Sequence, residues 1–116
     1  MRVVILTEGG EKIGFGHLSR CNAIYEAFES KGILPEIILN ADETSKDLLK
    51  EKKYRILNWV KEQKMLIKLI KNTDILIIDS YKAGANLYRK ISEAARISLY
   101  LDDNNRLNYP EGIVVN

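Results

Sequence analysis

The chain has 116 residues, a length that suits one domain, residues 1–116, and excludes a complete two-domain enzyme with its site between the domains. Its 18 Lys and Arg against 16 Asp and Glu give a net charge of +2, too even a balance to predict a nucleic-acid or anionic-membrane surface. One cysteine excludes an internal disulfide and a cysteine-based zinc site. No apolar run is long enough for a secretory signal or a membrane span, so we expect a cytoplasmic protein.

Short apolar runs alternate with helical periodicity along the chain. In order, we expect strand 2–7, helix 17–31, strand 35–40, helix 44–53, strand 54–57, helix 60–71, strand 74–79, helix 85–95, strand 97–101 and strand 113–115. Gly32 ends the first helix, and Cys21 lies on its apolar stripe with Tyr25, which predicts core packing for the thiol.

Strands that alternate with helices predict βαβ crossovers and therefore a parallel sheet with helices on both faces, a three-layer α/β sandwich. The expected strand order is 3-2-1-4-5, with the last short strand added outside. Ligands of such sheets bind beyond the carboxyl ends of the strands, near the switch point between the first and fourth strands. The segments expected there are 7–17, 79–84 and 102–106.

The first of these segments is rich in glycine, with glycines at 9, 10, 14 and 16. Such a turn between a strand and a helix lets backbone N–H groups approach an anion, although the glycines also suit a plain tight turn. The spacing is not a dinucleotide fingerprint, and Asn40 stands where that motif needs an acidic residue at the end of the second strand. No Gly-Lys-Ser/Thr follows, so it is not a Walker loop either.

His17, the only histidine, falls at the start of the first predicted helix. The helix dipole disfavours an imidazolium at this end, so the ring would stay neutral near pH 7 and could accept a proton. The alternative is an exposed helix-start residue without a role. Arg20 lies on the same side of the helix, as an anion or carboxylate contact or as a solvated charge.

Two other strand ends carry polar residues. Asp79-Ser80-Tyr81 follows the fourth strand, where Asp79 is a functional carboxylate or a turn cap, and Tyr81 is a pocket residue or a half-buried loop aromatic. Asp102-Asp103-Asn104-Asn105 follows the fifth strand. Paired carboxylates can bind a divalent ion, but no histidine or third carboxylate stands nearby in sequence, so we expect no metal.

The string Ile13-Gly14-Phe15-Gly16-His17-Leu18-Ser19-Arg20-Cys21 resembles the Ile-Gly-x-Gly-His-x-x-Arg-Cys signature of the UDP-sugar hydrolases of pseudaminic acid biosynthesis, which are grouped with spore-coat polysaccharide biosynthesis proteins. Asp79-Ser80-Tyr81, Leu101-Asp102-Asp103 and Val114-Val115-Asn116 resemble later segments of that family's N-terminal half. The resemblance spans the whole chain, and the nine-residue string is its specific part. One departure is Leu6-Thr7-Glu8-Gly9-Gly10, where the family has an Arg-Ala-Asp-Gly-like run.

The resemblance implies one Rossmann-like half of a glycosyltransferase-B-like fold, in an enzyme of surface polysaccharide biosynthesis that hydrolyses a UDP-deoxy-diacetamido-sugar at the anomeric carbon and releases UDP. No cofactor or metal is implied. His17 would be the general base; Gly14, Gly16, Arg20, Asp79 and Tyr81 would line the substrate. Most contacts to the nucleotide would come from a C-terminal half, so the isolated 116 residues are expected to be inactive. The alternatives are half of a glycosyltransferase and a non-catalytic Rossmann-like binding module.

Overall fold

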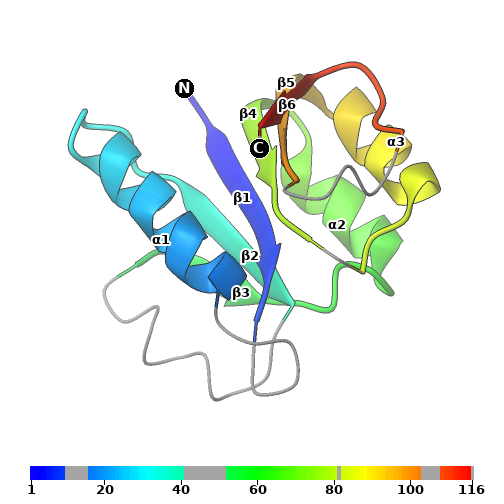
Figure 1. Ribbon diagram of the computed structural model, residues 1–116, viewed down its shortest axis with the longest axis horizontal. Coiled ribbons are helices and arrows are strands. Elements are labelled where there is room, and N and C mark those ends of the chain that lie inside the picture. Colours follow the sequence, from blue (N-terminus) through cyan, green and yellow to red (C-terminus); the bar gives the residue numbers. More distant parts are fainter. Residues whose placement is uncertain (10–15, 41–51, 81, 103–107, 116) are drawn as a thin grey trace.

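Six strands form one parallel sheet in the order β3-β2-β1-β4-β5-β6 in the computed structural model of the chain (Figure 1). The structure describes residues 1–9, 16–40, 52–80, 82–102 and 108–115, with side chains in the first helix from Ser19 onward. The strands are β1 Val3–Glu8, β2 Glu36–Asn40, β3 Tyr54–Ile56, β4 Thr73–Ile78, β5 Ala95–Leu101 and β6 Ile113–Val115. The predicted Rossmann-like α/β fold and strand order are confirmed.

Strand β1 lies in the middle of the sheet, between β2 and β4. All six of its residues are buried, as the unbroken run of β-branched and aliphatic residues predicts for a strand covered on both faces. The strand order reverses on the two sides of β1, because the chain moves outward to β3 and then crosses back to β4. This reversal makes the β1–β4 boundary the switch point of the sheet.

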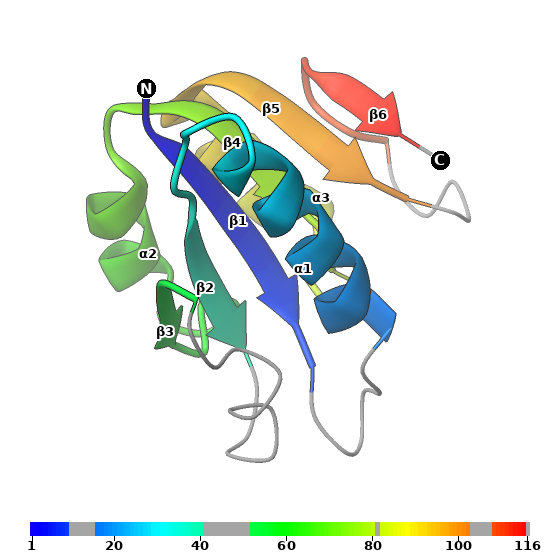
Figure 2. The same cartoon turned by 90° about the vertical axis from the view of Figure 1, so that its left-hand side faces the viewer.

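The helices cover opposite faces of the sheet (Figure 2). Helix α1, Gly16–Glu29, lies on one face, and α2, Gln63–Ile70, and α3, Ala85–Glu93, lie on the other. Right-handed crossovers require this arrangement, since connections that run in opposite directions along a parallel sheet must cross on opposite faces. The connection that follows β1 and the one that follows β4 therefore leave the switch point on opposite sides.

Alternate residues of the central strands build two separate cores. Val3 and Ile5 of β1 pack with Cys21 and Tyr25 of α1, whereas Val4 and Leu6 face the α2 and α3 side. The second core is the larger one and includes Trp59, whose indole Nε1 donates to the carbonyl oxygen of Thr7 at 2.9 Å. This hydrogen bond joins Thr7, the next-to-last residue of β1, to the turn that precedes α2.

Helix boundaries differ from the predicted ones for local reasons. Helix α2 begins at Gln63 rather than residue 60, because residues 58–62 form a turn in which the Glu62 N–H donates to the Asn58 carbonyl at 2.8 Å. Helix α1 ends at Glu29, and Gly32 adopts φ of 81°, a left-handed conformation that glycine takes without strain. Residues 44–51 of the predicted helix 44–53 lie outside the described residues, and Lys52 and Lys53 are not helical.

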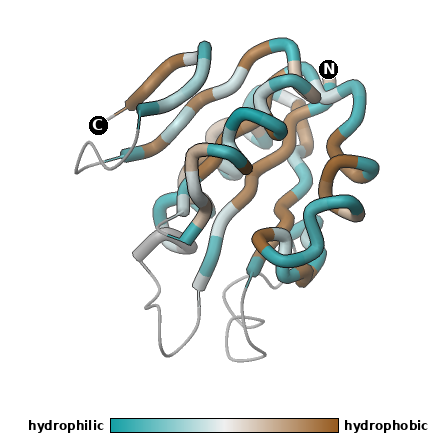
Figure 3. Tube along the Cα trace, turned by 90° about the vertical axis from the view of Figure 1, so that its right-hand side faces the viewer, coloured by the Kyte–Doolittle hydropathy of each residue, from teal (hydrophilic) through white to brown (hydrophobic). Residues whose placement is uncertain are grey.

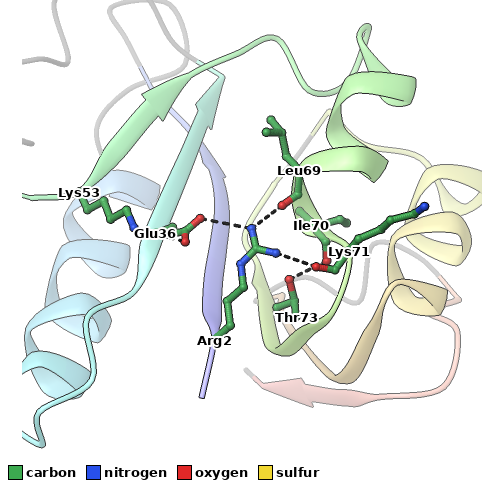
Figure 4. Close-up of polar contacts among 7 residues, drawn as sticks. All are labelled: Arg2, Glu36, Lys53, Leu69, Ile70, Lys71 and Thr73. Atoms are coloured by element: carbon green, nitrogen blue, oxygen red, sulfur yellow. Dashed lines mark hydrogen bonds and ion pairs between the residues drawn. The ribbon is translucent and has the colours of Figure 1, made fainter.

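Arg2 closes the carboxyl end of α2 (Figure 4). Its guanidinium donates to the carbonyl oxygen of Lys71 at 2.6 Å and to that of Leu69, and it pairs with Glu36 of β2 at 3.3 Å. A cation at a helix carboxyl end satisfies carbonyl groups that have no partner within the helix and interacts favourably with the helix dipole. The cluster joins α2 to the start of β1 and to β2, at the sheet edge opposite to the predicted ligand edge.

Candidate functional site

The motif helix α1 begins beside the carboxyl end of β1, at the predicted ligand edge. Strand β1 ends at Glu8, and the helix begins at Gly16 with His17 as its second residue. The backbone thus places His17 in the first turn of α1. The side chain of His17 lies outside the described residues, as do Gly14 and Tyr81.

Arg20 and Asp79 form a bidentate ion pair across this edge. Arg20 donates from Nε to Asp79 Oδ2 and from Nη2 to Asp79 Oδ1, both at 2.8 Å. The Asp79 side chain is 1% exposed and that of Arg20 is 34% exposed, so the carboxylate is inside the fold and the guanidinium reaches its surface. Two parallel hydrogen bonds between charged partners fix orientation as well as distance. The pair therefore joins the first turns of α1 to the end of β4.

Cys21 lies next to this pair and belongs to the α1-side core. Its Sγ is 3.9 Å from Asp79 Oδ2. Burial raises the pKa of the Cys21 thiol to about 12, and the negative charge of Asp79 adds to the rise. The thiol is therefore protonated near neutral pH and is not a nucleophile, in agreement with the predicted packing role.

A second polar contact also lies at the carboxyl ends of β1 and β4, but on the opposite face of the sheet. Ser80 Oγ donates to Glu8 Oε2 at 3.2 Å and accepts from the backbone N–H groups of Lys82 and Ala83, each at 3.1 Å. Glu8 and Ser80 are both buried. The serine thus links the carboxylate at the end of β1 to the turn that leads into α3.

The Glu8–Ser80 contact is missed by reasoning from the sequence, which treats Glu8 only as a departure from the family's pattern. The alternation of side chains along β1 does predict the face of the sheet on which Glu8 lies. Val4 and Leu6 face the α2 and α3 side, so Glu8 continues this row and must place a carboxylate on the same face. Only the neighbouring strand shows that a hydroxyl group meets it there.

Asp102 forms a third buried strand-end carboxylate, after β5. It accepts from the hydroxyl of Tyr109 at 2.6 Å, and its backbone N–H donates to the carbonyl of Val115 at 2.9 Å. Asp102 therefore supports the connection into β6. Asp103, Asn104 and Asn105 lie outside the described residues, and the described part of the chain contains no group of three His, Cys, Asp or Glu side chains able to hold a metal ion.

The described residues give this edge a definite electrostatic character. Glu8, Asp79 and Asp102 are buried carboxylates, and Arg20 is the cation paired with one of them. Each of these carboxylates accepts a hydrogen bond within the fold, Glu8 from Ser80, Asp79 from Arg20 and Asp102 from Tyr109. The described part of this edge therefore carries buried, hydrogen-bonded carboxylates and one guanidinium that reaches the surface.

Comparisons with protein-family models, with curated proteins and with solved structures find no match for this chain. Among the described residues, no helix is long and apolar enough to cross a membrane.

Proposed function

We propose that this chain is the N-terminal half of a two-domain nucleotide-sugar hydrolase, with His17 as general base. The observation that carries the proposal is the bidentate pair of Arg20 with Asp79. Both are residues of the segments that resemble the hydrolase family, and they stand 59 positions apart in the chain. Their pairing supports a common site for the motif helix and the end of β4.

In the proposed reaction, His17 accepts a proton from a water molecule at the carboxyl end of β1. The water oxygen forms a bond to the anomeric carbon of the sugar, and the bond from that carbon to the phosphate oxygen breaks, so UDP leaves with the electron pair. A neutral imidazole at the start of a helix suits this role, because it can accept the proton near pH 7. Asp79 acts through Arg20 by fixing the turn that carries His17.

The test uses a protein that carries this domain together with its C-terminal half, and follows UDP release from a UDP-sugar. We expect His17→Ala to lower kcat by about 10²–10⁴-fold, the usual effect of losing a general base. Ser19→Ala is the matched control, since Ser19 is an exposed neighbour on the same helix, and it should leave kcat within about twofold.

Near-normal turnover by the His17→Ala protein would overturn the role of His17. The same assay separates hydrolysis from glycosyl transfer, which needs the same base and places an acceptor hydroxyl where water stands. UDP release without any added acceptor supports hydrolysis, and release that depends strictly on an acceptor contradicts it.

A further inference from the structure

Helices α2 and α3 present a surface that the proposed enzymatic site does not use. A groove of about 610 Å³ runs along the outside of α2 and reaches α3. We call this surface the basic face; its lining residues are Lys61, Glu62, Gln63, Lys64, Met65, Lys68 and Lys90. It lies on the side of the sheet opposite to α1, away from the motif helix (Figures 1 and 2).

The charge of the basic face is not compensated by its neighbours. Four of its lining residues are lysines and one is a glutamate. The ion pairs within the described part of the chain involve other cations, namely Arg2, Arg20, Lys52, Lys53 and Arg96. Lys90 instead donates to the side-chain oxygen of Gln63 at 3.3 Å, a neutral partner. The four ammonium groups therefore leave a local positive field.

The arrangement of these lysines opposes the stability of α2. Lys64 and Lys68 are one turn apart on the same helix, and like charges at this spacing repel each other. Lys61 and Lys64 also lie near the amino end of α2, where the helix dipole disfavours cations; Glu62 at the N-cap offsets part of this effect, and Lys68 lies in the last turn, where the dipole favours it. An anionic partner would turn both unfavourable terms into favourable ones.

We propose that the basic face binds an acidic segment of a partner polypeptide. The lysines would pair with the carboxylates of this segment. Met65, 49% exposed, supplies one apolar contact at the centre of the groove, and methionine adapts well to varied side chains. Hydrophilic and hydrophobic stretches alternate along the trace of α2 (Figure 3), and Leu66 and Ile70 are the buried residues of this helix.

The same features disfavour two other anionic partners. No lining residue is aromatic, so the groove has no platform on which nucleic-acid bases would stack. Met65 is the large exposed hydrophobic side chain of the groove, which is too little apolar surface to insert into a bilayer. An acidic polypeptide needs neither of these features.

The test measures binding of a fluorescein-labelled peptide, made mostly of glutamate with interspersed leucines, to the full chain at about 0.15 M salt. The variant Lys64→Glu/Lys68→Glu reverses two charges of the basic face. The matched control, Lys31→Glu/Arg55→Glu, reverses two exposed cations elsewhere and changes the net charge equally, from +2 to −2. Circular dichroism verifies that both variants are folded. We expect the first variant to weaken binding by about tenfold or more and the control by less than about threefold.

Equal losses in the two variants would overturn the proposal, because binding would then follow net charge and not the basic face. Tighter binding of duplex DNA or of phosphatidylglycerol vesicles than of the peptide would assign the surface to another class of partner. Absence of peptide binding up to about 1 mM would show that the lysines are simply solvated. Self-association of the chain that Lys64→Glu/Lys68→Glu abolishes would make a second copy the partner instead.

Discussion

Asp79 is a residue whose contacts are open to two interpretations from the sequence and are defined by the structure. A carboxylate after a buried strand is equally consistent with a substrate contact and with a turn cap. In the structure both of its oxygens accept hydrogen bonds from Arg20, and the side chain is 1% exposed. The cation beside this carboxylate offsets the cost of burying its charge.

Replacement of Arg20 by alanine therefore tests the pair at the level of stability. We expect Arg20→Ala to lower the free energy of unfolding by about 2 kcal/mol, since it removes the partly exposed cation that donates to both oxygens of the buried Asp79 carboxylate. Arg89→Ala is the control, because Arg89 is exposed and forms no ion pair within the described residues, and its effect should stay within about 0.5 kcal/mol. Urea denaturation measures both; similar effects of the two changes would contradict the pairing.

The buried thiol of Cys21 leads to a prediction on pH. Its pKa is about 12 in the folded protein against 9.0 for an ordinary thiol, so the unfolded chain loses this proton first as the pH rises. The contribution of Cys21 to stability is present below pH 9 and is lost between pH 9 and about pH 12. Near pH 8, iodoacetamide should alkylate the native thiol far more slowly than the thiol in urea, because the thiolate is the nucleophile. Equal rates in the two states would show that Cys21 is accessible and not buried.

At the scale of whole elements, the amino end of the sheet depends on a long-range helix cap. Helix α2 has eight residues, too few to be stable alone, so tertiary contacts must hold it. Arg2, which precedes β1, supplies such a contact by donating to carbonyl oxygens at the helix carboxyl end. The sequence places Arg2 beside the first strand, but nothing in it shows that a helix more than 60 positions later ends there.

Removal of this cap should weaken the attachment of α2. We expect Arg2→Ala to cost about 1–2 kcal/mol of unfolding free energy, from lost charge-assisted hydrogen bonds on a partly exposed side chain. Lys71→Ala, at the same helix end but with an exposed side chain, is the control and should change stability by less than about 0.5 kcal/mol. Thermal unfolding followed by circular dichroism compares the two, and an equal shift for both would argue against the cap.

Across the whole molecule, the basic face and helix α1 lie on opposite sides of the sheet. The net charge of +2 conceals a basic face on α2 and α3, because a sum over the chain does not depend on where each charge lies. The near balance of 18 Lys and Arg with 16 Asp and Glu in the composition therefore argues only against a generally basic surface. The proposed enzymatic site and the proposed docking surface lie on opposite faces of one sheet, so each can be altered by substitution without directly changing the other.

The sequence by itself determined the architecture of this protein. Buried apolar runs such as residues 3–6 and the amphipathic spacing of Cys21 and Tyr25 are local patterns, and their alternation along the chain is typical of the doubly wound α/β fold, whose strand order matches the observed β3-β2-β1-β4-β5-β6. Elements and their order can be predicted from one sequence because these patterns do not depend on which side chains contact each other in the folded chain.

Only the tertiary structure decided the pairing of polar groups. Arg20 with Asp79, Glu8 with Ser80, and Arg2 with the end of α2 join residues between 59 and 72 positions apart. Each pair depends on strand register and on the angle of a packed helix to within about an ångström, because a hydrogen bond loses its strength beyond that tolerance. Residue types at strand ends indicate where chemistry is possible, whereas the folded chain selects the partner that each group meets.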